Sequence, residues 1–421
     1  MGGILMKILM LSWEYPPLSY GGLARHVQDL SEAMASKGHS LHIITQGDNN
    51  IPEKEEINGV MVYRTRRVKV GGNNFVDDIL HLNYQLLERA IEVKQKLGGV
   101  DLIHAHDWLV FWAGKVLKHS LKKPLVYTIH ATEYGRNQGI YNDMQRYIND
   151  LEWYACYEAW RVIVCSNYMK NEVKGLFQVP DDKVEMISNG VNIENYQAKS
   201  DSKYRSKYAH PEEKIVFYVG RIVREKGIQV LLRAVPQILN QDEDVKFVIA
   251  GKGPFLSSLK DHAGFLGINK KVYFTGFISD EERNKLYHAA DTAVFPSLYE
   301  PFGIVALEAM ATKTPVITTS AGGLDEFVKH GINGLKVMPD NPKQLADTIL
   351  HVLNNPDQCK EMAEKAYKFV RDKHNWEKIA DQTEKLYGKI LSEYENCDWN
   401  KQNENKYINT RKKSYAYRYM L

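Results

Sequence analysis

The chain has few cysteines, little excess charge and no long apolar run, and each shortage excludes a class of protein. Its 421 residues include four cysteines and no C-x-x-C pair, so neither a disulfide scaffold nor a zinc knuckle is expected. A net charge of only +3 gives no reason to expect nucleic-acid binding. No apolar run approaches the roughly 18 residues of a bilayer-spanning helix. We therefore expect no membrane span and a reducing, cytoplasmic setting.

The remaining composition is that of an ordinary globular protein. Hydrophobic residues make up 44% and charged residues 25% of the chain, and its length suggests two or three domains. At the N-terminus, the apolar stretch before Trp13-Glu14-Tyr15 is cut short. It predicts a first strand rather than a signal peptide.

Strands and helices alternate through the first half of the sequence. Lys7–Ser12 is a nearly continuous apolar run, as in a strand buried on both faces of a parallel sheet. An amphipathic helix follows and ends at Gly38. Further strands are predicted at Leu41–Gln46, Val60–Thr65, Asp101–His106, Leu125–His130, Arg161–Ser166 and Lys183–Ser188. This rhythm predicts a doubly wound α/β domain over residues 1–195.

The rhythm restarts after a polar stretch, 187–213, that we interpret as a linker. The second half has predicted strands at Ile215–Val219, Val245–Ala250, Val272–Phe277, Thr292–Phe295, Pro315–Thr319 and Gly334–Val337. Residues 196–375 therefore predict a second Rossmann-like domain that faces the first across a cleft. A final helix, 376–393, is expected before a polar and basic tail, 394–421, whose end from Trp399 on suits a loosely held segment.

The segment from Phe295 to Pro315 carries two carboxylates, Glu300 and Glu308, eight positions apart. Pro301 disfavours helical angles at Glu300, which predicts a loop there and a helix from Gly303 onward. Eight helical residues span about 12 Å, roughly the length of a nucleotide sugar. Our hypothesis is that Glu300 holds the sugar, the amides of Phe302, Gly303 and Ile304 hold phosphate, and Glu308 holds ribose. The alternative is an amphipathic helix with an acidic start.

Other polar groups follow predicted strands, where open α/β sheets bind their ligands. Gly21 and Gly22 open a helix and could meet phosphate, although an ordinary turn is equally compatible with them. Arg221 and Lys226 could clamp a diphosphate, or form a solvated basic turn. His104 and His106 point to one face of a strand, so a metal site is conceivable, but no further ligands lie nearby in the sequence. His130 could be structural or catalytic.

These segments together resemble a known family. E-P-F-G-I-V-A-L-E, from Glu300 to Glu308, looks like the E-x7-E signature of retaining glycosyltransferases of family 4, which have the GT-B fold. W-E-Y-P-P with G-G-L-A-R-H-V, and H-A-H-D-W, resemble the bacterial glycogen and starch synthases in particular. One departure is Ser19, where the classical glycogen synthases have a lysine two positions before the first glycine. The resemblance covers the chain up to about Glu393.

The resemblance implies roles for individual residues. It places the family's active-site histidine at His130 and its diphosphate-binding cations at Arg221 and Lys226, whereas Arg224 is expected on the surface. Gly251 and Gly253 match a turn near the nucleotide base, and Gly322-Gly323 is expected to be structural, with donor contact conceivable. Asp107, Glu133 and Arg136 are acceptor-side candidates.

Two charged stretches are interpreted as surface features. Asp242-Glu243-Asp244 is a D-x-D, but it precedes a strand and so lies at the wrong end of a sheet for a site. We therefore expect no metal or other cofactor to be required. The basic run from Arg64 to Lys69 could face an anionic acceptor or a lipid, but a solvated strand end is favoured.

The predicted function is transfer of a hexose, with glucose expected, from an ADP- or UDP-sugar to an α-glucan, with retention at the anomeric carbon. Alternatives are transfer to a sugar phosphate, a lipid or a cell-surface glycan, a sugar-nucleotide epimerase, and a non-catalytic sugar-nucleotide-binding protein. The donor base, the acceptor and the oligomeric state stay open.

Overall fold

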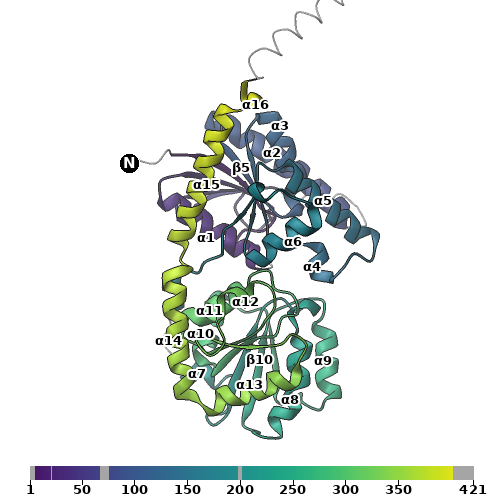
Figure 1. Cartoon of the computed structure of the whole chain (residues 1–421), viewed down its shortest axis with the longest axis vertical. Helices are drawn as coiled ribbons and strands as arrows, with labels where there is room; N and C mark the ends of the chain where they lie inside the picture. Colours follow the sequence, from purple (N-terminus) through teal and green to yellow (C-terminus); the bar gives the residue numbers. More distant parts are fainter. Residues whose placement is uncertain (1–4, 20, 67–74, 198–201, 402–421) are drawn as a thin grey trace, which may run out of the picture.

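The computed structural model describes residues 5–19, 21–66, 75–197 and 202–401, with the side chains of 202, 400 and 401 left aside. Tyr20, positions 67–69 of the basic run, positions 198–201 of the predicted linker and the tail from 402 lie outside the described residues. Figure 1 shows two α/β units stacked along the long axis of the molecule.

The first unit is built on an eight-stranded sheet in the order β3-β4-β2-β1-β5-β6-β7-β8. All neighbouring strands are parallel except β3 and β4. The strands are β1 (Lys7–Leu11), β2 (Ser40–Thr45), β3 (Lys54–Ile57), β4 (Val60–Arg64), β5 (Leu102–His106), β6 (Leu125–Ile129), β7 (Arg161–Val164) and β8 (Val184–Met186). The helices are α1 (Gly22–Ser36), α2 (Phe75–Leu97), α3 (Phe111–Leu121), α4 (Glu133–Asn137), α5 (Asp143–Glu158) and α6 (Asn167–Phe177).

The second unit has a six-stranded, wholly parallel sheet in the order β11-β10-β9-β12-β13-β14. Its strands are β9 (Lys214–Val219), β10 (Val245–Ala250), β11 (Val272–Gly276), β12 (Thr292–Phe295), β13 (Val316–Thr319) and β14 (Leu335–Val337). Its helices are α7 (Ser202–Arg205), α8 (Ile228–Leu239), α9 (Leu256–Phe265), α10 (Asp280–Ala289), α11 (Ile304–Ala311), α12 (Gly323–Phe327), α13 (Pro342–Asn354) and α14 (Pro356–Lys373).

The central strands are apolar because helices cover both faces of each sheet. In β1 and β6, the buried residues run almost without interruption rather than alternating. The strand order places β1 beside β5 and β9 beside β12. In each sheet, the order in which the chain adds strands therefore reverses at the first strand, β1 or β9. In folds of this kind, ligands bind at the carboxyl ends of the strands beside that reversal.

The C-terminal helix α15 (Trp376–Asn396) returns to the first unit, as Figure 1 shows, and α16 (Asp398–Lys401) follows it. Glu393 pairs with Arg161 at 2.5 Å, and the Tyr387 hydroxyl lies 2.6 Å from His104 Nδ1. These contacts attach α15 to the sheet of the first unit. Among the described residues, no helix combines the length and the apolar character that crossing a bilayer requires.

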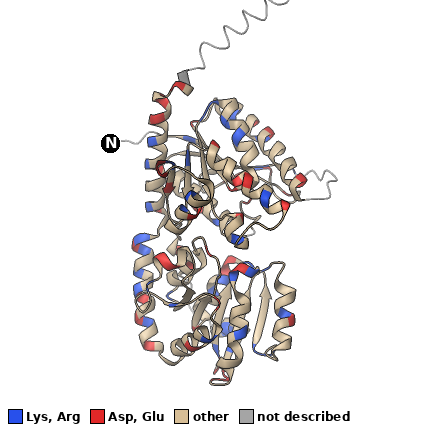
Figure 2. Cartoon of the chain, turned by 45° about the vertical axis from the view of Figure 1, so that its right-hand side comes forward, with Lys and Arg blue, Asp and Glu red and all other residues tan. Residues whose placement is uncertain are grey.

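The predicted elements are present in the described residues, with boundaries shifted by up to two or three residues. Some described elements were not predicted individually, among them the edge strand β3 and the helix α14. Strand β3 alternates exposed with half-buried residues and has the sequence K-E-E-I, which carries little β propensity. In the view of Figure 2, acidic and basic positions are interspersed along the helices of both units.

Candidate active site

Loops at the carboxyl ends of the strands in the two sheets meet between the units. A Cβ added to Gly21, in the loop after β1, would lie 3.5 Å from Cδ of Arg221, in the loop after β9. A Cβ added to Gly22 would lie 3.4 Å from Cδ1 of Ile304 at the start of α11. The two predicted glycines therefore face the predicted diphosphate loop and the predicted phosphate-binding helix.

Lys226 and Glu300 form an ion pair at the centre of this region. Lys226 Nζ lies 2.7 Å from Glu300 Oε2, which also accepts a hydrogen bond from Ser297 Oγ at 3.1 Å. Glu300 is only 6% exposed, so the pair is held in a largely desolvated setting. The Arg221 side chain is 42% exposed, and its nearest acidic partner is Glu225 at 3.6 Å. The Arg221 side chain is thus accessible to a ligand, whereas the Lys226 side chain is already held in place by Glu300.

Backbone contacts hold the loops that carry these charges. The amide groups of Leu298 and Tyr299 both donate to the Glu225 carbonyl, at 2.8 and 3.2 Å. Gly227 has φ +71°, and a Cβ there would lie 1.8 Å from the Pro296 carbonyl oxygen. Only glycine permits this approach, so Gly227 sets the distance between the loop of Lys226 and the loop of Glu300.

Gly251 and Gly253 pack against the main chain of the Arg221 loop. Added Cβ atoms would lie 1.9 Å from the Gly220 oxygen and 2.1 Å from the Ile222 oxygen. The structure thus gives both glycines a packing role, and their contact with a nucleotide base stays a prediction. Gly322 likewise packs on the Glu300 carbonyl, at 2.1 Å from an added Cβ.

The start of α11 lies next to Glu300. Gly303 has φ +103° and precedes the first helical residue, Ile304. The Phe302 ring points into the core, where it packs against Phe327 at 5.3 Å between centroids. The amide groups predicted to bind phosphate thus lie in or just before the first turn of α11.

Glu308 sits in an enclosed ionic network. Its carboxylate is 3.2 Å from Arg283 Nε, 3.1 Å from the Tyr287 hydroxyl and 3.7 Å from Nε of Arg25, a residue of α1 in the first unit. Glu308 is 2% exposed. Arg25 therefore occupies the side of Glu308 that faces the first unit, and the ribose contact of Glu308 stays a prediction.

In the first unit, a backbone hydrogen bond connects His130 to the side chain of Asp107. The His130 amide donates to Asp107 Oδ1 at 2.8 Å, and Arg136 lies 4.0 Å from Asp107 Oδ2. Burial raises the pKa of Asp107 to about 6, against the opposing effect of Arg136. Burial, and secondarily Arg136, lower the pKa of His130 to about 3, so this imidazole is neutral at physiological pH.

The other acceptor-side candidates separate in the structure. Arg136 faces Asp107, as described, whereas the Glu133 carboxylate accepts a hydrogen bond from the Asn137 amide at 2.9 Å within α4. The Glu133 backbone amide donates to both oxygens of Glu152, at 3.0 Å each. The Glu133 carboxylate is therefore bonded within its own helix. Arg136, which lies beside Asp107, is the better placed of the two to contact an acceptor.

The two histidines of the H-x-H pair lie on one face, as predicted, but have different partners. His104 is bonded through both ring nitrogens, to Thr128 Oγ1 at 2.7 Å and to the Tyr387 hydroxyl at 2.6 Å. His106 Nδ1 lies 3.2 Å from His130 Nε2. His104 is thus tied to the fold, and His106 belongs to the site.

Sequence reasoning missed several residues of this region. The Glu14 carboxylate accepts hydrogen bonds from the Gly21 amide at 3.1 Å and from Trp13 Nε1 at 2.8 Å, and so shapes the first glycine loop. Arg25 and His26 also reach the site from α1. All lie within the quoted W-E-Y-P-P and G-G-L-A-R-H-V segments or beside them, but their spacing carries no signal of its own.

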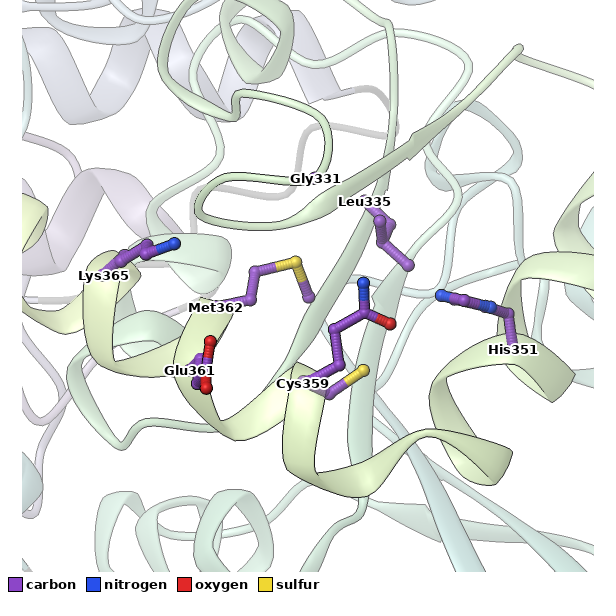
Figure 3. A pocket seen from close by; sticks show the side chains of 8 residues that line it. Gly331, Leu335, His351, Cys359, Glu361, Met362 and Lys365 are labelled. Atoms are coloured by element: carbon purple, nitrogen blue, oxygen red, sulfur yellow. The ribbon is translucent and has the colours of Figure 1, made fainter.

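The charged stretches expected at the surface lie away from the site. Asp242 and Asp244 precede β10, and Asp242 pairs with Lys214 at 2.8 Å at the amino ends of the strands. Arg64 is buried and donates to the Pro16 and Pro52 carbonyls, so the solvated strand end expected there is wrong for this residue. A cavity of about 150 Å³, seen in Figure 3, also lies elsewhere, between α13, α14 and the amino end of β14.

Comparisons with known proteins agree with this architecture. Residues 20–195 match the family model described as Glycosyltransferase Family 4, and residues 200–369 match that of glycosyl transferases group 1. An uncharacterized glycosyltransferase of Methanocaldococcus jannaschii is 40% identical over 392 residues, which cover 91% of this chain and 98% of that protein. A glycogen synthase of Mycobacterium tuberculosis is 33% identical over 397 residues, 91% of this chain and 94% of that protein.

Solved structures share the fold. The sucrose-phosphate synthase from Thermosynechococcus elongatus superposes with a TM-score of 0.80 at 26% identity, over 92% of this chain and 99% of that one. The catalytic domain of starch synthase IV from Arabidopsis thaliana, bound to ADP and acarbose, superposes with a TM-score of 0.75 at 17% identity, over 92% and 100% of the chains.

Proposed function

Because the chain belongs to glycosyltransferase family 4 and has its GT-B fold, we propose that it transfers glucose from an ADP- or UDP-sugar to an α-glucan, with retention at the anomeric carbon. The observation that carries this proposal is the Lys226–Glu300 pair beside Arg221, opposite Gly21 and Gly22. It offers cations to a diphosphate and a carboxylate to sugar hydroxyls within one region, in which Glu300 is buried and Arg221 is accessible.

The proposed chemistry rests on charge stabilisation. As the glycosidic bond of the donor breaks, negative charge grows on the diphosphate, and Arg221, Lys226 and the amide groups of α11 would stabilise it. We infer that these groups do the work of a divalent ion, so chelators should not lower turnover. His130, kept neutral by burial, can hydrogen-bond the transferred sugar without adding charge.

Retention is inferred from the family, and the arrangement of the site bears on how it is achieved. A double displacement would need a carboxylate nucleophile just below the anomeric carbon. Glu300 is instead held by Lys226 and Ser297, which suits a hydroxyl-binding role. We therefore propose reaction on one face, with the leaving phosphate accepting the acceptor proton. Movement of the two units about the 187–213 segment would exclude water.

The acceptor is inferred from relatives. Identity of 33% to a glycogen synthase along nearly the whole chain favours an α-glucan. The sucrose-phosphate synthase that superposes at a TM-score of 0.80 favours a second candidate, a sugar phosphate. Arg136 beside Asp107 could receive either a phosphate or a hydroxyl.

A donor and acceptor screen tests the proposal. ADP-glucose and UDP-glucose are each offered with glycogen, maltose, glucose 1-phosphate and fructose 6-phosphate, and α-linked product is identified by NMR. We expect product with glycogen or maltose. Turnover of donor without any acceptor would favour an epimerase, and nucleotide binding without turnover would favour a sensor.

Matched arginine variants test the site itself. Arg221→Ala should lower kcat about 10²- to 10³-fold, as the loss of a preorganised transition-state contact does. Arg224→Ala, three residues on and exposed, should leave kcat unchanged. Product formation that survives Glu300→Ala combined with Arg221→Ala would contradict the assignment.

A further inference from the structure

Three histidines from three separate segments converge beside the proposed active site. His26 comes from α1, His106 ends β5, and His130 follows β6. Each offers one ring nitrogen, and these three atoms all lie within 4.8 Å of one another. We propose that His26, His106 and His130 bind a divalent transition metal ion such as zinc, and that the bound ion inhibits transfer at the proposed active site.

The spacing of the nitrogens suits such an ion. His106 Nδ1 and His130 Nε2 are 3.2 Å apart. Two nitrogens bound tetrahedrally to zinc at 2.0–2.1 Å lie about 3.3 Å apart. His26 offers a ring nitrogen to the same cluster, in which one ligand atom from each histidine lies within 4.8 Å of the others, so small ring rotations would bring the three nitrogens into one shell. Three imidazoles with a fourth position left for water is a common zinc arrangement.

The tautomer of His26 is set for ligation. Its Nδ1 lies 2.7 Å from Asn189 Oδ1, which fixes the proton on Nδ1 and leaves the lone pair on Nε2. Among the described residues, the buried Nε2 of His26, the atom left for the ion, finds no hydrogen-bond partner. Buried polar atoms of this kind are costly unless a ligand satisfies them.

The charge next to the cluster is offset. Arg136, the cationic neighbour of His130, lies 4.0 Å from the Asp107 carboxylate.

Inhibition follows from the position of His130. It is the only half-buried member of the three, so an ion can enter from its side. A ligated His130 can no longer hydrogen-bond a transferred sugar. The inhibitory effect of the ion rests on the proposed function, whereas its binding does not. His104, whose two ring nitrogens are already bonded, stays outside the set although it belongs to the H-x-H pair.

The test uses the full chain stripped of metal. Zinc binding is measured by equilibrium dialysis with elemental analysis, and cobalt(II) provides a visible spectrum that reports nitrogen ligation. We expect one ion per chain and intense visible bands typical of four or five ligands. Failure of the wild-type chain to bind either ion stoichiometrically overturns the site.

Variants separate ligation from folding and from activity. His26→Gln should abolish stoichiometric binding, and Asn189→Ala, which only removes the partner of His26, should weaken it about 10- to 100-fold. His351→Gln, an exposed histidine outside the cluster, should bind normally. Unaltered binding by His26→Gln overturns the site. Zinc that binds wild type without slowing turnover overturns the inhibitory part alone, and a chain with no transferase activity at all fails the proposed function instead.

Discussion

At the scale of single residues, the site is built from polar groups that the fold removes from water. Asp107 has φ +59°, a backbone angle that non-glycine residues seldom adopt. Its carboxylate accepts a hydrogen bond from the His130 amide. This geometry aims the carboxylate back at the loop after β6. Burial raises the pKa of this carboxyl group to about 6.

The pH dependence of acceptor binding should follow Asp107. Its pKa is raised to about 6, so the carboxylate is ionised above pH 6 and neutral below it. A neutral carboxyl is a weaker acceptor for a hydroxyl, and the KM for acceptor should rise about tenfold, equivalent to roughly 1.4 kcal/mol, as pH falls from 8 to 5. His130, with a pKa of about 3, adds no step in this window.

Steady-state kinetics between pH 5 and 8 measure this effect. In Asp107→Asn, which cannot ionise, the KM should be high at every pH and the step near pH 6 should vanish. A step that persists in this variant would assign the titration to another group.

At the scale of elements, loops after parallel strands carry the chemistry, and glycines set their separation. The loop after β9 and the loop after β12 touch through Gly227 and Pro296. This contact places Lys226 against Glu300. The ion pair therefore depends on a residue that has no functional group.

Gly227→Ala should damage activity more than its chemistry suggests. The new Cβ would lie 1.8 Å from the Pro296 oxygen, so one loop must move. A displacement of about 1 Å at a site can cost a hundredfold in rate, and we expect a fall of that order in kcat/KM.

Gly267→Ala is the matched control. Gly267 has nearly the same angle, φ +69°, but an added Cβ meets nothing within 4 Å. This variant should lose only about 1–2 kcal/mol of stability and keep its kcat/KM. Thermal unfolding and kinetics of both variants separate strain from displacement, and equal losses of activity would contradict the argument.

At the scale of the whole molecule, the two units meet through specific polar contacts as well as apolar ones. The Glu326 carboxylate of α12 accepts hydrogen bonds from the backbone amides of Asn167 and Tyr168 at the start of α6, at 3.0 and 2.6 Å. Ser166 Oγ donates to the Pro301 carbonyl at 2.7 Å, next to Glu300. A helix of one unit is thus capped by a carboxylate of the other, beside the proposed site.

Glu326→Gln should loosen this contact. An anionic cap at a helix N-terminus contributes about 0.5–2 kcal/mol. We expect the amide groups of Asn167 and Tyr168, which donate to Glu326, to exchange with solvent about tenfold faster, measured by hydrogen exchange. Asp325→Asn, the neighbouring residue, breaks a pair with Lys336 inside the second unit and should leave α6 unchanged. Equal protection in both variants would show that α6 is capped independently of the other unit.

The alternation of strands and helices, and the functional loops at the carboxyl ends of the strands, can be inferred from the amino-acid pattern. Apolar runs such as Lys7–Leu11 can only be buried between two helical layers, and parallel strands put their loops at one edge. The E-x7-E and H-A-H-D-W segments led to the family, which the comparisons confirmed. The residue roles drawn from that resemblance stay predictions.

Which charges meet depends on the packing of distant segments. Lys226 and Glu300 are 74 positions apart, and His26 and His130 belong to different elements, so no local pattern relates them. Arg25 reaches Glu308 across the two units for the same reason. Spacing along a chain predicts which face a side chain occupies, whereas its partner depends on how distant segments pack, and burial then sets the charge state that each group keeps.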